Sequence, residues 1–196
     1  MKLLHDGYYL KSLSKEEFIE AQGNTGKEVF TKEHYIFPNT YLSDQEKDNI
    51  SHLNKEMNAT PFSLHLVIFD KEDNFVAWSY GFQENAHNYY MCNSGVVESH
   101  RRKGLYTLLL NETIKIVSEK GFQVIYSRHN ATNNSVIIPK LKAGFTISNF
   151  ELSDIFGVLV HLKLYTNSTR RKINDYRSGQ LAPDEQINSL FKKDHR

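Results

Sequence analysis

The sequence predicts a mixed α/β domain in which helices cover both faces of a mostly antiparallel sheet. Apolar and aromatic runs between residues 62 and 97 are separated by short polar turns, which is typical of a β-meander. A basic turn that ends in Gly104 is then followed by leucines at helical spacing. A strand, a helix and two further strands are expected between this helix and residue 165. Together with the meander, the strands form a mixed sheet, which is neither purely parallel nor purely antiparallel.

The N-terminal region predicts one short strand followed by two helices. Residues 7–13 form the first apolar run. Ser14 and Glu17 have the spacing of a capping box, so a helix is expected to begin there. Residues 44–57 place apolar side chains at helical spacing and predict an amphipathic helix, which Pro61 follows.

The remaining elements follow from alternating apolar runs and glycine stops. They are expected as strands at 62–69, 75–82 and 89–97, a helix from 105 to about 120, a strand at 122–127, a helix at 133–143, and strands at 145–152 and 157–165.

The chain length of 196 residues is enough for one domain with a substantial core. We expect that domain to cover residues 1–166. The remaining tail, 167–196, is basic and has few large apolar residues, which predicts short helices or a partly mobile segment.

Charge and cysteine content exclude several functional classes. The net charge is +1, with 24 basic and 23 acidic residues, which argues against a nucleic-acid partner. A single cysteine, Cys92, cannot form an internal disulfide and fits a reducing compartment. The nine histidines lack the spacing of metal ligands, so no metal site is expected. No run is long and apolar enough for a signal core or a membrane span, so the prediction is a cytoplasmic protein with no membrane partner.

The turn before the long helix has the chemistry of a phosphate site. The N-terminus of a helix presents unpaired N–H groups and the positive end of the helix dipole. Arg101, Arg102 and Lys103 add positive charge, and Gly104 lets the backbone approach a ligand closely. A solvated surface turn is the alternative, but the position between strand and helix favours a diphosphate site.

These residues also carry a family resemblance. The spacing Arg101-x-x-Gly104-x-Tyr106 resembles the acetyl-CoA signature of the GNAT superfamily of N-acetyltransferases, although Tyr106 stands where the family has Gly or Ala. The later block from 130 to 145 resembles a second family motif. There Asn133 matches the Asn that contacts CoA, and Lys140 stands where the family usually has a Tyr.

The resemblance implies an acetyl-CoA site on a splayed strand, the glycine turn and the start of two helices. It would include Ser94, Gly95, Val96, Val97, Arg101, Arg102, Lys103, Gly104, Leu105, Tyr106, Thr107 and Asn133. A backbone N–H of this strand, near Val97, would polarise the thioester carbonyl. Two of these residues have structural alternatives, since Gly95 can relieve crowding in a strand and Asn133 can be a helix N-cap.

Three residues are candidates for proton transfer. Lys140 would donate a proton to the leaving thiolate if it faces the thioester, although a helix lysine is more commonly solvated. Tyr126 is a phenol candidate for the same role. Glu98 is the candidate general base, with His100 and His129 as polar alternatives near the expected cleft.

The function that the resemblance implies is direct acetyl transfer from acetyl-CoA to a primary amine of a small molecule or peptide. The alternative is a CoA-binding sensor or interaction module without catalysis, and the chain would be a monomer or a homodimer. The acceptor would bind near residues 30–58 and 153–157, which contain the aromatic residues Tyr35, Phe37, Tyr41 and Phe156.

Overall fold

The structure is a computed structural model and describes residues 1–23, 25, 29, 44, 61–85 and 87–193. Most of the helix predicted at 44–57 lies outside these residues. The acceptor-site candidates Tyr35, Phe37 and Tyr41 also lie outside them.

One eight-stranded sheet forms the centre of the described part of the chain, in the order β1-β2-β3-β4-β5-β6-β8-β7. Every neighbouring pair is antiparallel except β5 and β6, which are parallel. The strands are β1 (Lys2–Leu3), β2 (Tyr9–Leu13), β3 (Ser63–Phe69), β4 (Phe75–Gln83), β5 (Asn88–Val96), β6 (Val124–Asn130), β7 (Thr146–Ser153) and β8 (Gly157–Tyr165). The prediction of a mixed, mostly antiparallel sheet is therefore confirmed.

The largest differences from the predicted strands are at the N-terminus and in β6. The short strand β1 was not predicted, and the strand predicted at 7–13 begins only at Tyr9. Gly7 instead ends the 3-10 turn η1 (His5–Gly7) with φ +75°, a left-handed conformation that glycine adopts readily. The strand β6 ends three residues later than predicted, because its pairing with β8 continues to Asn130.

Five helices accompany the sheet in the described residues: α1 (Lys15–Gln22), α4 (Leu105–Glu119), α5 (Asn134–Lys142), α6 (Ser168–Arg177) and α7 (Glu185–Lys193). The capping box at the start of α1 is present. The Ser14 hydroxyl accepts from the Glu17 N–H at 3.1 Å, and the Glu17 carboxylate accepts from the Ser14 N–H at 2.8 Å.

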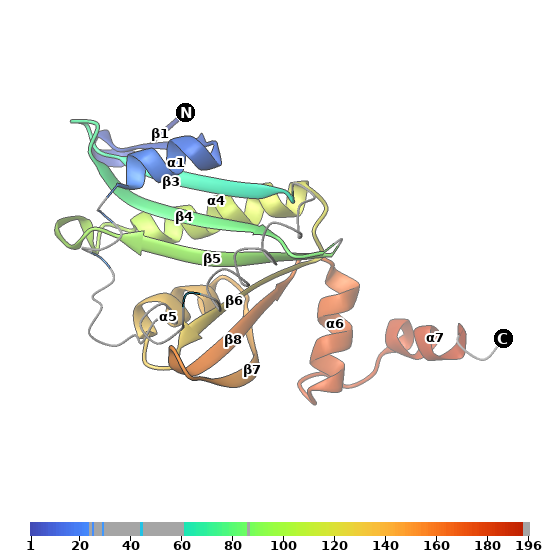
Figure 1. Ribbon diagram of the computed structural model, residues 1–196. Helices are drawn as coiled ribbons and strands as arrows, with labels where there is room; N and C mark the ends of the chain where they lie inside the picture. The colour runs from blue at the N-terminus through green and yellow to red at the C-terminus, as the bar shows by residue number, and fades with distance from the viewer. Residues whose placement is uncertain (24, 26–28, 30–43, 45–60, 86, 194–196) are drawn as a thin grey trace.

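The alternation of side chains along the strands gives each face of the sheet its own core. On one face, Leu64, Leu66 and Ile68 of β3 pack in a cluster with Leu109 of α4 and with α5. On the other face, Val67 and Trp78 pack against Phe18 of α1. Figure 1 shows α1 and α4 on opposite sides of the sheet, so the predicted two-sided helix cover is confirmed.

The strands β5 and β6 pair only at their first residues and then diverge. Their register runs from Asn88↔Val124 to Tyr90↔Tyr126, after which β5 continues to Val96 beside no part of β6. Figure 1 shows this widening gap between the two strands. The edge of β5 that faces away from β4 therefore has no strand partner beyond Tyr90 among the described residues.

The tail forms two helices. The guanidinium of Arg171 on α6 donates to the Gly144 carbonyl at 2.6 Å, and Arg170 donates to the Gln123 side chain at 2.7 Å. These bonds hold α6 against the body, whereas α7 lies farther from the sheet (Figure 1). The domain boundary at residue 166 stays a prediction.

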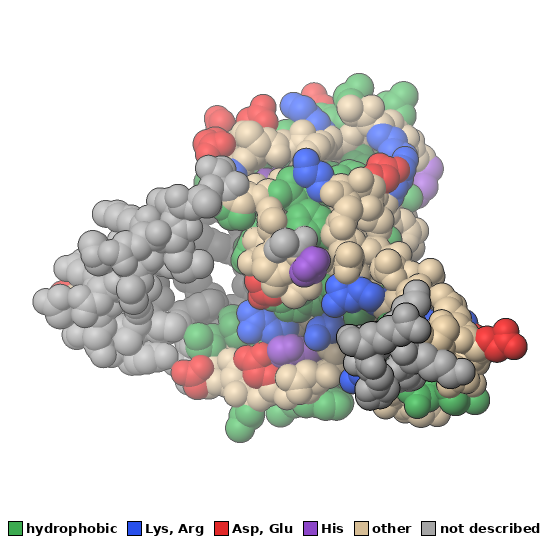
Figure 2. Space-filling view, turned by 90° about the vertical axis from the view of Figure 1, so that its right-hand side faces the viewer, with side chains coloured by type: hydrophobic (Ala, Val, Ile, Leu, Met, Phe, Trp, Pro, Cys, Tyr) green, Lys and Arg blue, Asp and Glu red, His purple; other side chains and the backbone are tan. Residues whose placement is uncertain are grey.

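The surface carries mixed charge. Figure 2 shows acidic, basic and hydrophobic side chains interspersed on one face, as the net charge of +1 leads one to expect. Hydrophobic side chains gather at its lower edge, near β7 and β8, where Ile147, Phe150, Leu152 and Val158 are exposed. Among the described residues, no helix combines the length and the apolar character needed to cross a membrane.

Candidate acetyl-CoA site

The turn between β5 and α4 has the backbone geometry of an anion site. A 3-10 turn, η4 (Glu98–His100), precedes Arg101, and α4 begins at Leu105. Arg102 and Gly104 have φ values of +64° and +75°. No side chain caps this helix, so the N–H groups of its first turn are available to a ligand. The ideal Cβ position at Gly104 has no atom within 4 Å, so the space beside this glycine is open.

A cavity of about 610 Å³ lies beside this turn and brings the two sequence blocks together. Its walls are the second half of β5, the turn, the start of α4 and one side of α5. The lining residues are Val29, Ser94, Gly95, Val96, His100, Arg101, Arg102, Gly104, Leu105, Tyr106, Thr107, Asn133, Ser135, Val136 and Pro139. All but two of the cofactor residues proposed from the sequence are in this lining.

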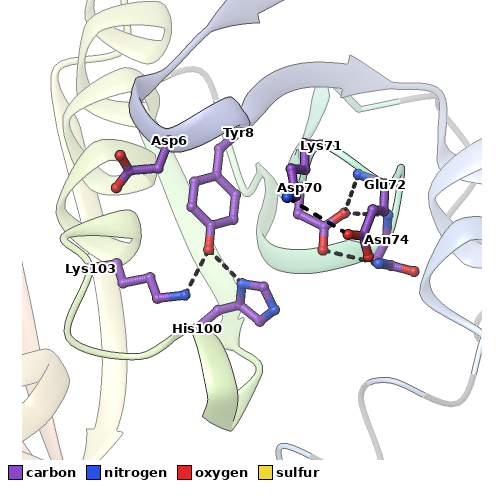
Figure 3. Close-up of a pocket in the computed structure, with 8 residues that line it drawn as sticks. All are labelled: Asp6, Tyr8, Asp70, Lys71, Glu72, Asn74, His100 and Lys103. Atoms are coloured by element: carbon purple, nitrogen blue, oxygen red, sulfur yellow. Dashed lines mark hydrogen bonds and ion pairs between the residues drawn. The ribbon is translucent and has the colours of Figure 1, made fainter.

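The two exceptions are Val97 and Lys103. The Val97 N–H donates to the Val76 carbonyl at 2.9 Å, so this N–H is not free to polarise a thioester carbonyl, and the expected donor near Val97 would have to be another N–H of the strand. The Lys103 ammonium donates to the Tyr8 hydroxyl at 3.0 Å and lines a second cavity of about 470 Å³. Figure 3 shows Lys103 pointing to Tyr8 in that second cavity.

Tyr106 is the residue that departs from the family signature, and its side chain packs against the core while the residue lines the cavity. Among the described side chains, its hydroxyl oxygen is the buried polar atom without a hydrogen-bond partner. Burial raises the pKa of Tyr106, which keeps the phenol protonated. A buried polar group normally has a partner, so this hydroxyl is an exception.

Gly95 and Asn133 were each given two interpretations. A Cβ on Gly95 would lie 2.5 Å from the Trp78 ring, so this position must be glycine for packing, and its backbone also lines the cavity. Asn133 lies at the N-cap position of α5, but its side chain makes no capping bond. Its Oδ1 instead accepts from the Ser135 hydroxyl at 2.7 Å, so the side-chain cap interpretation is wrong.

Lys140 is buried, which overturns the expectation of a solvated lysine. It is 1% exposed and lies where β5 and β6 begin to diverge. Its ammonium donates to the Ser127 hydroxyl at 2.6 Å and lies 3.5 Å from the Met91 sulfur. Burial lowers its pKa from the ordinary 10.5 to about 7. Lys140 does not line the cavity itself, although its neighbour Pro139 does.

A histidine extends the polar network of Lys140. The His129 Nε2 lies 2.9 Å from the Ser127 hydroxyl, so Ser127 bridges Lys140 and His129. Burial, followed by the charge of Lys140, lowers the pKa of His129 to about 2, which keeps the imidazole neutral. The sequence suggested His129 only as a polar loop residue, but the structure places it within β6.

The other two catalytic candidates are not brought close to Lys140. Tyr126 projects from the opposite face of β6, where its hydroxyl donates to the Glu84 carboxylate and its ring stacks on Tyr90 at 4.9 Å. Burial and then Glu84 raise the pKa of Tyr126. Glu98 is exposed in η4 and does not line the cavity.

Some residues of the site were not identified from the sequence. Ser135, Val136 and Pro139 line the cavity from α5. Helical periodicity would have linked Asn133 to Val136 and Val136 to Pro139, because residues three positions apart are neighbours on the helix surface. Nothing local in the sequence marks Tyr8 as a neighbour of the turn.

Comparisons with known proteins agree with this geometry. The family model described as "Acetyltransferase (GNAT) family" matches residues 28–145, which is more than half of the chain. A search of curated protein sequences found no match.

Several solved structures share the fold. The ribosomal-protein-S18-alanine N-acetyltransferase of Escherichia coli is 14% identical with a TM-score of 0.59, and the match covers 82% of this chain and 94% of that one. The yncA protein of Salmonella typhimurium, solved with its cofactor acetyl-CoA, is 13% identical with a TM-score of 0.60, covering 83% and 95%. A mutant spermidine N-acetyltransferase of Vibrio cholerae is 13% identical with a TM-score of 0.55, covering 82% and 94%.

The family match decides between the two interpretations of the sequence. It favours an enzyme over a module that only binds CoA. The chain belongs to the GNAT family of acetyltransferases, which use acetyl-CoA as co-substrate.

Proposed function

We propose that the protein transfers the acetyl group of acetyl-CoA directly to a primary amine of a small molecule or peptide. The observation that carries this proposal is the cavity of about 610 Å³, whose lining contains both the glycine turn and Asn133. Two solved structures with this fold are named as acetyltransferases of a ribosomal-protein alanine and of spermidine. Both of these acceptors carry amines, which supports an amine acceptor here.

The diphosphate of CoA would bind at the N-terminus of α4. The N–H groups of Leu105, Tyr106 and Thr107 belong to the first turn of a 15-residue helix, where the dipole favours an anion. Arg101 and Arg102 line the same cavity and add positive charge. Arg101 also donates to the Val96 carbonyl at 3.2 Å, which ties the turn to the end of β5.

The pantetheine arm would lie along the edge of β5 that β6 leaves unpaired. This edge runs from Met91 to Val96, a distance of roughly 16–17 Å at the usual rise of a strand. The backbone of such an edge offers donors and acceptors to the amides of the arm. An arm that starts at the turn therefore brings its thioester near Met91, the strand residue that contacts Lys140.

The reaction needs an amine, a polarised carbonyl and a proton for the leaving group. The neutral amine nitrogen would attack the thioester carbonyl carbon, the carbon–sulfur bond would break, the nitrogen would release one proton to water, and the thiolate would take a proton. We assign that proton to the Lys140 ammonium. We assign the polarisation of the carbonyl to the β5 backbone at Cys92, where a bulge between Tyr80↔Asn93 and Gly81↔Met91 leaves this residue outside the ladder.

An assay of CoA release tests this proposal. The purified protein is incubated with acetyl-CoA and a panel of polyamines, peptides with free N-termini and lysine peptides, and the free thiol is measured. We expect thiol release that depends on one class of amine, together with acetylated product of the matching mass. The Gly104→Val variant serves as the negative control. Thiol release that is equal with and without every amine would contradict amine acetylation.

A further inference from the structure

A second cavity lies beside the turn between β5 and α4, next to the candidate acetyl-CoA cavity. Its volume is about 470 Å³, and it lies between the N-terminal segment, the β3–β4 turn and the residues before α4. His100 lines both cavities. A contact that fixes the position of His100 in the second cavity therefore also fixes part of the lining of the acetyl-CoA cavity.

Tyr8 is the residue that joins these parts. Its ring is 4% exposed and packs in the core, and its hydroxyl lies 2.6 Å from the His100 Nδ1 and 3.0 Å from the Lys103 Nζ. The Tyr8 and His100 rings meet edge to face with centroids 5.6 Å apart. Figure 3 shows both dashed contacts converging on the one phenol oxygen.

One phenol oxygen can serve both contacts. A lysine ammonium only donates, so the Tyr8 oxygen accepts from Lys103. The hydroxyl keeps one O–H and a second lone pair, so it can bond the His100 Nδ1 in either tautomer of the imidazole. Asp70, one of the acids that line this cavity, accepts from the Glu72 N–H and the Asn74 N–H within the β3–β4 turn, each at 2.9 Å.

These two bonds lie on either side of the strained part of the turn. Between His100 and Lys103, Arg102 has a φ of +64°, which is unfavourable for a residue with a side chain. Such a conformation persists only where the surrounding structure holds it. Tyr8 holds the residue before Arg101 and the residue after Arg102, from a position more than ninety residues away in the sequence.

We propose that Tyr8 is a positioning residue for acetyl-CoA. By fixing His100 and Lys103 through one hydroxyl, it holds the turn so that the first N–H groups of α4 face the diphosphate. This inference rests on the proposed function, because it concerns the same cofactor site. It assigns to the N-terminal segment a role in binding CoA, although Tyr8 does not line the CoA cavity.

Calorimetry with three ligands tests this role. CoA and dephospho-CoA both carry the diphosphate, whereas pantetheine lacks it. In the Tyr8→Phe variant we expect the Kd of CoA and of dephospho-CoA to rise alike, by about ten-fold, as for loss of a hydrogen bond to a charged group. The Kd of pantetheine should stay within two-fold, since pantetheine does not use the turn.

A matched control and a double variant exclude a general loss of structure. Tyr9→Phe removes a hydroxyl one residue away, which donates to Asp73 at 3.0 Å and does not approach the turn, so all three affinities should be unchanged. Lys103→Met removes one of the two contacts at an exposed side chain. The effect of Tyr8→Phe should be smaller in the Lys103→Met background than in the wild type, as expected for residues that act through one contact.

Three results would overturn the inference. An unchanged CoA affinity in Tyr8→Phe would show that the hydroxyl does not position the turn. An equal loss for pantetheine would indicate a general disturbance of the fold. A loss for CoA but not for dephospho-CoA would mean a direct contact with the 3′-phosphate. If the wild-type protein does not bind CoA at all, the proposed cofactor site is itself wrong, and this outcome is separate from the other three.

Discussion

The substitution Lys140→Met tests the most unusual group of the site. Lys140 is 1% exposed, and its pKa falls to about 7 from the ordinary 10.5 because burial disfavours the charged form. Methionine is similar in length, carries no charge, and leaves Ser127 its contact with His129. The substitution therefore removes the ammonium without leaving a cavity or an unpartnered hydroxyl.

The first readout is the free energy of unfolding as a function of pH. The folded pKa of Lys140 lies below its unfolded value, so between pH 7 and 10.5 the unfolded chain binds more protons than the folded one. The free energy of unfolding of the wild type should therefore rise with pH across this window. A shift of this size corresponds to about 5 kcal/mol as an upper limit.

The variant lacks this contribution. Lys140 also lowers the pKa of His129, but an imidazole is mostly neutral in the folded and the unfolded chain between pH 7 and 10.5, so His129 adds little within this window. The difference in unfolding free energy between Lys140→Met and the wild type should be greatest in favour of the variant below pH 7, and it should decrease as the pH approaches 10.5. Urea unfolding at half-unit pH steps measures this difference. A difference that does not change with pH would refute the lowered pKa of the buried Lys140 side chain.

The second readout is turnover. Loss of a general acid costs about 10²–10⁴-fold, so we expect kcat to fall in that range while the Kd of CoA stays within a few-fold. Wild-type kcat should decline above about pH 7, where Lys140 loses the proton that it donates, and this decline should be absent in Lys140→Met. Lys140→Tyr should retain activity, since a phenol can also donate. Unchanged turnover in Lys140→Met would mean that water or another side chain protonates the thiolate.

Three further predictions concern the cofactor turn, the packing of β5 and the tail. Gly104→Val should abolish CoA binding by calorimetry, because a β-branched residue is strained at a φ of +75° and its side chain would fill the open space beside the turn. The rest of the protein should stay folded, since no atom lies within 4 Å of the new Cβ, and equal CoA affinity would refute the site. Gly95→Ala should lower the free energy of unfolding, measured in urea, by about 1–3 kcal/mol, because the new methyl would lie 2.5 Å from the Trp78 ring. An unchanged free energy of unfolding would mean that the ring moves aside freely. A chain that ends at Thr166 should still fold and bind CoA, with lower stability because the bond from Arg171 to the Gly144 carbonyl is lost; an insoluble product would move the domain boundary.

The order of the elements and most of the lining of the candidate cofactor cavity could be predicted from the sequence, because their signals are local. A strand, a basic turn, a glycine and a helix of period 3.6 lie next to one another between Ser94 and Leu110, and backbone amides at a helix N-terminus need no distant partner to bind an anion. The helix 105–120 was predicted within one residue of its end at Glu119. The same local pattern carried the family resemblance.

The tertiary structure alone decided which side chains are buried and which partners they meet. Lys140 is buried because β5 and β6 diverge beneath it and place Met91, 49 residues away in sequence, and Ser127, 13 residues away, around its ammonium. The Val97 N–H is taken by Val76 because β4 continues to pair with the end of β5. Lys103 donates to Tyr8, a residue 95 positions away, and does not line the candidate acetyl-CoA cavity. Burial and hydrogen-bond pairing at these positions depend on which strands are neighbours in the sheet, and sequence periodicity does not contain that order.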